Sequence, residues 1–487
     1  MAILKPCRKL SLLIAGSITC LAFNQTALAT APAMTMAIDA DDASQATTGP
    51  LSFLDGISRS NGMLGNMWGV RPWLGQYGVT LAVQETSETF GALTGGYHQG
   101  FEYDGLTQVA TQLDTQRAFG WYGGTFNISV LNIHGRNFSA DNFGTLQTQS
   151  GISADDTTRL WEAWYQQKFL DQDRLDIKIG QQSLDQEFMV SQNANYFVNT
   201  MFGWPMVPSA DMPGGGPAYP LSALGVRMRA RHNDSLTFLG GVFNGSPDKN
   251  PYSDDSQINN AHGTSFPMGG GLLAIAEVQY AYPALGSMVS AEGSQPLSRL
   301  YKLGFWYDSE SFADEQYDTL GRSLADPLSN GNPLMHKGNY AIYAVADQML
   351  WHSDNIDDRT LNFFTRIMGT PLTDRNLIDF SMNAGFTLHE PFFGRDDDTF
   401  GIGMGYAHVS NSVSAFDRAQ TFFGTATPAQ TGETYIEATY QYQVAPWWQL
   451  QPDFQYVINP GAGEIDPGTN GKVGNEAIIG IRTNILF

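Results

Sequence analysis

The sequence predicts an all-β fold, a transmembrane antiparallel β-barrel of about sixteen strands with one long loop folded inward. Three observations lead to this prediction. After Gly78 the dominant hydrophobic period is two, as in β-strands. The alternating segments are roughly ten residues long, enough for a tilted strand to cross a bilayer. Beyond the first 29 residues no apolar run approaches the roughly 18 residues that a membrane-spanning helix needs.

Composition agrees with a membrane barrel. Only 15% of the 487 residues are charged, whereas soluble chains average about 25%. Glycine occurs 52 times, and aromatic residues make up 12%, which suits a chain with many turns and a lipid-facing surface. The formal net charge of −22 argues against a nucleic-acid partner, because polyanion recognition requires a basic surface.

The N-terminal residues 1–29 read as a signal peptide. Basic residues precede an apolar stretch at 10–23, and Ala27-Leu28-Ala29 fits a cleavage site. Both cysteines, Cys7 and Cys20, lie in this segment, so the mature chain is expected to lack disulfides and thiol chemistry. Signal-peptide export directs the chain out of the cytoplasm.

Two further regions follow the signal peptide. Residues 30–66 form a polar leader, within which the spacing of apolar residues from Leu51 to Gly65 predicts a short amphipathic helix. Residues 67–487 form the predicted barrel domain.

The alternation also predicts which side chains face lipid. Val226, Met228 and Ala230 alternate with Arg227, Arg229 and Arg231, and the segments near residues 126, 177, 363, 380 and 438 alternate in the same way. Apolar side chains are expected to point outward into lipid and polar ones inward, since successive residues of a strand face opposite sides. A soluble sandwich would have the reverse arrangement, with the apolar set in a dry core.

The last strand carries a further signal. Ile479, Ile481 and Ile485 share one face with Phe487, the final residue. This arrangement resembles the C-terminal strand by which outer-membrane barrels are recognised, so the barrel assembly machinery is an expected partner through Phe487.

Connections differ in length. Tight turns are predicted at 171–173, 233–234 and 445–446, and long polar connections at 137–156, 246–270, 308–337 and 411–432. The longest connection, residues 183–224, is rich in aromatic residues, including Phe197, Phe202 and Trp204. A loop of that length and composition is poorly explained as a solvated loop, so we expect it to fold into the lumen and narrow it.

Several stretches together resemble the carbohydrate-selective porin family of the OprB type. They are residues 67–74 (MWGVRPWL), 175–181 (LDIKIGQ), 219–225 (YPLSALG), 242–245 (VFNG) and 451–461 (QPDFQYVINPG). The resemblance runs from about Trp68 to Phe487. It implies a sixteen-stranded barrel in the bacterial outer membrane, in contact with lipid and lipopolysaccharide. It also implies passage of glucose and related neutral sugars, through either a monomer or a homotrimer.

Candidate pore-lining residues follow from the inward face. Arg227, Arg229 and Arg231 form the leading set, and Arg366, Asp176, Lys178 and Asp379 are further candidates. Charged groups could bind sugar hydroxyls, or they could simply be cations balanced by acids in a wet interior. Trp204, Phe202 and Phe197 could stack on sugar, or they could pack the loop against the wall.

Enzyme signals are weak. The chain contains no GxxxxGK[ST], HExxH, GxSxG or CxxC motif, so no catalytic residue, cofactor or metal is predicted. The run Asp396–Asp398 could bind calcium but reads more simply as a solvated turn. Two alternatives remain open: a general, polyol or organic-acid channel on the same barrel, and a soluble exported β-rich sugar-binding protein or enzyme.

Overall fold

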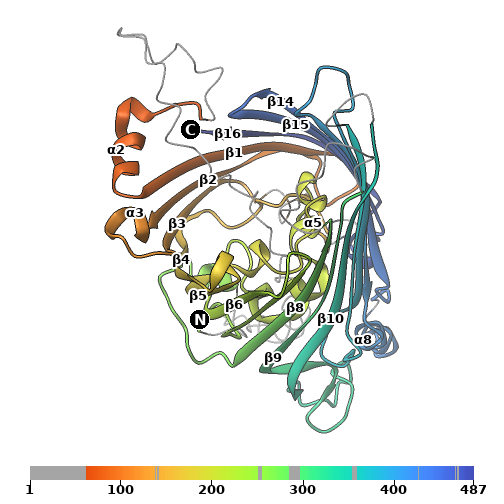
Figure 1. The fold of residues 1–487 in the computed structure, drawn as a ribbon. Coiled ribbons are helices and arrows are strands. Elements are labelled where there is room, and N and C mark those ends of the chain that lie inside the picture. Colours follow the sequence, from red (N-terminus) through yellow and green to blue (C-terminus); the bar gives the residue numbers. More distant parts are fainter. Residues whose placement is uncertain are drawn as a thin grey trace, which may run out of the picture.

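The computed structural model describes residues 62–487, except 138, 140–141, 250–254, 284–296, 354–358, 426, 467 and 469–470. Sixteen antiparallel strands form one closed barrel in which each strand pairs with its sequence neighbours and β1 pairs with β16 (Figure 1). The predicted barrel is therefore confirmed. The predicted signal peptide and nearly all of the predicted leader, with the helix predicted between Leu51 and Gly65, lie outside the described residues apart from 62–66.

The sixteen strands are 8 to 20 residues long, so the longest are twice the predicted length of roughly ten residues. The strands are β1 (Val79–Thr94), β2 (Gly100–Asp114), β3 (Gly124–Gly135), β4 (Thr157–Phe169), β5 (Leu175–Gln182), β6 (Ala223–Arg231), β7 (Leu236–Asn244), β8 (Leu272–Tyr282), β9 (Arg299–Asp318), β10 (Pro333–His352), β11 (Thr360–Gly369), β12 (Ile378–His389), β13 (Thr399–Val409), β14 (Gly432–Ala445), β15 (Trp448–Ile458) and β16 (Glu476–Leu486).

Short helices occupy the connections. The α-helices are α2 (Val70–Gln76), α3 (Thr115–Phe119), α5 (Thr200–Gly203), α6 (Met206–Asp211), α7 (Ser256–Asn259) and α8 (Asn411–Phe422). The 3-10 helices are η2 (Met67–Gly69), η3 (Asp171–Asp173), η4 (Leu184–Gln186), η5 (Ala194–Tyr196), η6 (Pro213–Gly215) and η7 (Pro460–Ala462). Within the described ranges, no helix has the length and apolar character needed to cross a membrane.

Side-chain burial follows the predicted inside-out pattern. On β6, Val226 and Met228 are 44% and 48% exposed, whereas Arg227 between them is 2% exposed. On β3, Phe126 and Ile128 are exposed and Asn127 is buried. A lipid-facing surface explains the exposed apolar set, because such a surface would be unfavourable in water.

Barrel closure involves the end of the chain. The backbone N–H of Phe487 donates to the carbonyl oxygen of Val83 at 2.9 Å, beyond the ladder between β1 and β16. Arg71, at the start of α2, donates to the carbonyl oxygen of Phe487. The segment that precedes β1 is thereby attached to the seam at which the first and last strands meet.

The two ends of the barrel differ. One end, which we call the turn end, carries the turns 171–173, 233–235 and 446–447. The opposite loop end carries the connections 136–156, 183–222, 245–271 and 410–431. The predicted connection 308–337 is much shorter than expected, because β9 and β10 pair as far as Asp318 and Pro333. The N–H and C=O groups of paired strands form hydrogen bonds with each other in water as well as in lipid. The polar sequence of this segment is therefore compatible with the extension of β9 and β10 beyond the predicted strands.

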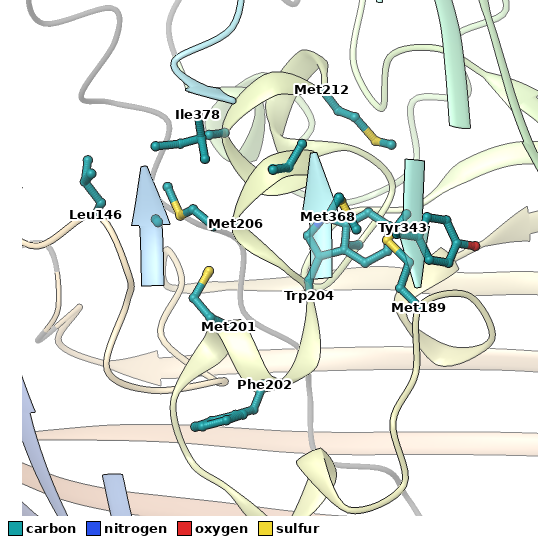
Figure 2. Close-up of a cluster of buried hydrophobic side chains, with 14 of the residues drawn as sticks. Leu146, Met189, Met201, Phe202, Trp204, Met206, Met212, Tyr343, Met368 and Ile378 are labelled. Atoms are coloured by element: carbon teal, nitrogen blue, oxygen red, sulfur yellow. The ribbon is translucent and has the colours of Figure 1, made fainter. Parts of the chain in front are cut away.

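Much of the barrel interior is filled rather than open. Residues 183–222 turn inward and bring α5 and α6 inside the barrel (Figure 1). Figure 2 shows Met201, Phe202, Trp204 and Met206 of this inner loop beside wall residues such as Met368, and all are buried. The predicted inward-folded loop is therefore present, with its own apolar core.

Candidate functional site: the narrowed barrel interior

The aromatic residues of the inner loop pack against one another and against the wall. The rings of Phe197 and Phe202 stack with centroids 4.3 Å apart, and Phe202 lies edge-on to Phe364 at 5.6 Å. Trp204 is fully buried, and its Nε1–H donates to the carbonyl oxygen of Gly215 at 3.0 Å. Phe202 and Trp204 thus lie buried between the loop and the wall, while Phe197 also borders a cavity described below.

Glycines on β13 make room for this packing. A Cβ atom built on Gly403 would lie 2.7 Å from the ring of Phe202, and one on Gly401 would lie 2.9 Å from the ring of Phe197. Real Cβ atoms do not approach neighbouring atoms so closely, so the two glycines allow the loop to approach the wall. The alternating run Gly401-Ile402-Gly403-Met404-Gly405 is a signal in the sequence for this close approach.

Carboxylates of the wall bind the backbone of the inner loop. Glu437 of β14 accepts hydrogen bonds from the N–H groups of Val198 and Asn199, at 2.6 and 3.0 Å. Asp347 of β10 accepts from Ser191 Oγ at 2.6 Å and from the N–H of Asn193 at 3.2 Å. These contacts satisfy loop N–H groups that lack secondary-structure partners, and they fix the height of the loop in the barrel.

Arg366 of β11 binds carbonyl oxygens of the inner loop, whereas the wall carboxylates bind its donor groups. Its Nη1 donates to the carbonyl oxygens of Gly203 at 2.7 Å and Met189 at 3.2 Å, and its Nη2 donates to that of Met201. The side chain is 3% exposed. The structure therefore places this predicted pore-lining residue beneath the loop, because loop carbonyl oxygens occupy its donors.

A charged cluster lies on the wall formed by β5 and β6. Arg227 is paired with Asp176 and, through Nε, with Glu187 of the inner loop at 2.6 Å. Lys178 also pairs with Glu187. Arg229 donates to Asp176 at 2.8 Å, yet its side chain remains 45% exposed. The structure thus brings four predicted residues together, and among them the side chain of Arg229 is the most exposed.

The remaining two predicted residues lie elsewhere. Arg231 donates to the backbone oxygens of Gln172 and Asp173, and so caps the turn between β4 and β5. Asp379 lies in an irregularity between Ile378 and Phe380, where the register shifts, and it pairs with His408 Nδ1 at 2.6 Å. His408 belongs to the alternate set of β13 that includes the exposed Phe400 and Ile402. The shift interrupts the period of two on which the inward assignment of Asp379 rested.

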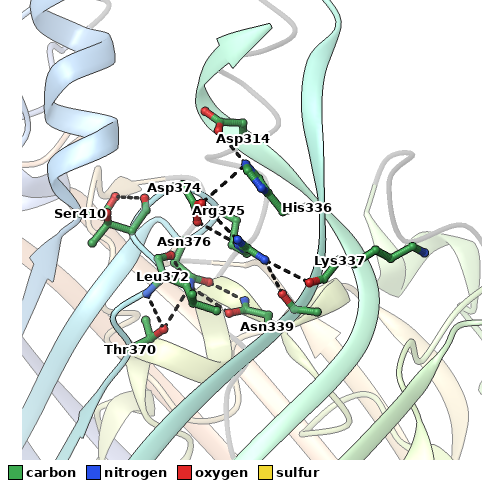
Figure 3. Close-up of polar contacts among 12 residues, drawn as sticks. Asp314, His336, Lys337, Asn339, Thr370, Leu372, Asp374, Arg375, Asn376 and Ser410 are labelled. Atoms are coloured by element: carbon green, nitrogen blue, oxygen red, sulfur yellow. Dashed lines mark hydrogen bonds and ion pairs between the residues drawn. The ribbon is translucent and has the colours of Figure 1, made fainter. Parts of the chain in front are cut away.

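A polar network braces the inner loop at the loop end (Figure 3). Asn339 and Asn376 exchange amide hydrogen bonds at 2.6 and 3.0 Å, and Asn339 also donates to the carbonyl oxygen of Asp211 in α6. Nearby, the Arg375 guanidinium lowers the pKa of Asp374 by hydrogen bonding to its carboxylate. The β9–β10 hairpin is thereby connected to the inner loop.

A cavity of about 650 Å³ lies in the lumen between the inner loop and strands β14, β15, β16 and β1. It reaches the turn end, because Pro446, Trp447 and Leu486 line it. Seven glutamines and three asparagines are among its lining residues. None of them is among the residues that the sequence predicts to line the pore, although glutamines at 441, 443, 449 and 451 recur at a spacing of two on adjoining strands.

The charged groups that line this cavity already have hydrogen-bond partners within the protein. Arg482 of β16 pairs with Glu88 of β1. Asp185 of the inner loop accepts from Ser183 Oγ at 2.6 Å and from the N–H of Tyr219 at 3.1 Å. Burial raises the pKa of Asp185 to about 6 in spite of these hydrogen bonds. The cavity therefore presents mainly uncharged amide and aromatic groups.

The acidic run at 396–398 has a defined arrangement at the turn end. Asp398 is held by Arg395 at 2.6 Å, by Tyr440 Oη at 2.6 Å and by the N–H of Gln443 at 2.9 Å. Burial opposes ionisation of this carboxyl group, but the three hydrogen bonds outweigh it and lower its pKa. Among the described residues, no group of three or more His, Cys, Asp or Glu side chains is arranged to hold a metal ion.

Comparisons with known proteins agree with this architecture. A family model described as "Carbohydrate-selective porin, OprB family" matches residues 98–487. Porin B of Pseudomonas aeruginosa is 23% identical over 460 residues, which cover 88% of this chain and 92% of that protein. The high-pH structure of Pseudomonas putida OprB has a TM-score of 0.76 at 22% identity, and the low-pH structure has 0.53 at 17%. Each covers 88% of this chain and 99% of the other, so the likeness extends over the whole barrel.

Proposed function

The chain belongs to the carbohydrate-selective porin family of the OprB type and is thus an outer-membrane porin for small sugars, not an enzyme; on this premise we propose which groups the sugar meets. Sugar moves through the space between the inner loop and strands β14 to β1, while Arg229 contacts solute from the β5–β6 wall. The observation that carries the proposal is the cavity of about 650 Å³ left beside a loop that is bound to the wall.

The inner loop sets the size limit in this proposal. Its contacts with Glu437, Asp347 and Arg366 include backbone groups from several points of the loop, so its position depends on the wall. Passage of monosaccharides with exclusion of longer oligosaccharides is the expected result. Contacts along the path have to stay weak, because a tightly held sugar would block flux.

Liposome swelling tests the proposal. Proteoliposomes are placed in isotonic glucose, then in a disaccharide and a trisaccharide, and in a monovalent anion of glucose size. Rates should fall steeply with sugar length. Arg229→Ala should lower the glucose rate severalfold, whereas Arg322→Ala, in the connection between β9 and β10, should leave it unchanged. Equal rates for glucose and the anion would remove the sugar preference.

One observation favours a second candidate substrate class. Arg229 is a half-exposed cation that pairs with Asp176, and Asp176 also pairs with Arg227. An accessible guanidinium attracts carboxylates, so uronates or other organic acids could pass on the same barrel. Faster swelling in glucuronate than in glucose would favour this candidate.

Partners other than sugar complete the proposal. The outer surface contacts lipid and lipopolysaccharide, and β16 with Phe487 is the strand that the assembly machinery recognises. Pairing of β16 with both β15 and β1 supports this role, because closure requires that strand. Phe487→Ala should slow assembly in the outer membrane, as followed by heat-modifiable gel mobility. Cross-linking in membranes separates a monomer from a homotrimer.

A further inference from the structure

The cavity at the turn end has a lining built from connected amides. Gln449 Nε2 donates to the Oε1 atoms of Gln441 and Gln443, at 3.2 and 3.4 Å, and its Oε1 accepts from Asn484 Nδ2 at 3.1 Å. Asn484 in turn accepts from Thr86 Oγ1 at 2.8 Å. A single chain of side-chain hydrogen bonds therefore runs across β14, β15, β16 and β1.

This chain keeps hydrogen-bonding capacity toward the cavity. An amide side chain offers two N–H donors and an oxygen with two lone pairs. Among contacts between described residues, Gln441 uses one donor, toward the carbonyl oxygen of Tyr196 at 3.2 Å, and one acceptor, toward Gln449. Mutual contacts also hold each amide in one orientation, which reduces the entropy lost when a ligand binds.

The chemistry of the lining selects a class of ligand. Adjacent amide donors and acceptors complement vicinal hydroxyl groups, each of which both donates and accepts. Tyr196 and Trp447, also in the lining, add aromatic surface for the C–H face of a pyranose ring. An anion would have to shed water with no unpaired cation to receive it, since Arg482, the cationic residue of the lining, is paired with Glu88.

We propose that the amide chain of Gln441, Gln443, Gln449 and Asn484 forms a weak binding site for an uncharged monosaccharide, on the turn-end side of the inner loop. This inference rests on the proposed function, because a sugar must first reach the lumen. The site lies beyond the loop, next to the turn formed by Pro446 and Trp447. A sugar that has passed the loop rests there before it leaves, and it occludes part of the ion path.

Ion current through single channels in planar bilayers tests the site. Glucose is added to either side of the wild-type channel. The measured quantity is the half-effect concentration, at which glucose reduces the current by half of the maximal reduction. That concentration should be lower from the turn-end side. In the double variant Gln441→Met/Gln449→Met it should rise by roughly tenfold or more, because two ligand hydrogen bonds are lost. Glucuronate should reduce the current less than glucose.

A glutamine away from the cavity provides the matched control. The Nε2 atom of Gln112 on β2 donates to Asn127 Oδ1 at 3.3 Å, and Gln112 is not part of the lining. The half-effect concentration of glucose for Gln112→Met should therefore stay within twofold of the wild-type value. An unchanged half-effect concentration in the double variant would overturn the site. If the methionine pair fails to assemble, the single variant Gln441→Met replaces it, with a smaller expected rise in that concentration because fewer ligand hydrogen bonds are lost.

Parallel liposome swelling separates this inference from the proposed function. If wild-type protein passes glucose but glucose never reduces the current, the site is wrong and the function stands. If wild-type protein passes no glucose, the proposed function itself fails.

Discussion

The guanidinium group of Arg366 donates a hydrogen bond to the carbonyl oxygen of Gly203 at 2.7 Å and so links β11 to the inner loop, 163 residues earlier in the chain. The same group also binds the carbonyl oxygens of Met189 and Met201. One wall cation thus holds three separate points of the loop. Under the proposed function, we therefore expect the size of the passage to depend on a residue that is itself buried beneath the loop.

Arg366→Met should loosen the inner loop. The substitution leaves three carbonyl oxygens without their donor, at about 1–3 kcal/mol for each buried group that finds no other partner. A disaccharide that wild type excludes should then enter liposomes faster. Arg322→Met is the control, because Arg322 binds Leu328 in the distant β9–β10 connection. Unaltered size exclusion in Arg366→Met would contradict the role assigned to this contact.

The two arginines of β6 should behave differently. Arg227 is buried and paired with Asp176 and Glu187, so Arg227→Ala should lower stability by about 3–5 kcal/mol, the usual result of breaking a buried pair. Arg229 is half-exposed, so Arg229→Ala should change solute flux with a loss of less than about 1 kcal/mol. Unfolding in detergent and liposome swelling measure the two effects. Similar stability losses would refute the distinction.

Gly403→Ala should displace the inner loop from β13. The added Cβ would lie 2.7 Å from Phe202, and overpacking of this kind costs about 1–3 kcal/mol. Greater protease cleavage within residues 183–222 and a lower unfolding temperature are expected. Gly240→Ala serves as the control, because its Cβ would meet no atom closer than 3.5 Å. Equal protease resistance in both variants would rule out the proposed close contact.

The α8 connection should lose stability as pH rises. Burial raises the pKa of Asp417 to about 6, and the hydrogen bond from the N–H of Gln430 only partly offsets it. A carboxyl group whose folded pKa lies above its unfolded value of about 3.9 binds its proton more tightly when folded. Stability should therefore fall by about 2–3 kcal/mol between pH 4 and pH 6.5, and then level off.

Hydrogen exchange of the α8 amides measures this dependence. Asp417→Asn keeps the shape of the side chain and carries no charge. In this variant the exchange rate of the α8 amides should change little over the same pH range, once the intrinsic pH dependence of amide exchange is corrected for. A wild-type profile as flat as that of the variant would show that Asp417 does not titrate in this window.

Local patterning alone predicted the barrel. Val226, Arg227 and Met228 alternate because a strand between lipid and lumen needs opposite chemistry on its two faces, and that requirement acts residue by residue. The aromatic content of residues 183–224 likewise indicated an inward loop, since such side chains need a place away from water.

The roles of individual polar residues required the tertiary structure. Arg227, Arg229 and Arg366 carry the same group at inward positions, yet one is paired with two acids, one remains accessible and one binds loop carbonyl oxygens. An inward position fixes only which way a side chain points. What it meets there is set by segments far away in the chain, such as Glu187 and Gly203, whose approach depends on the packing of the whole loop. The amide-lined cavity has the same origin, because strands β14 to β1 contribute glutamines that become one surface only when the barrel closes.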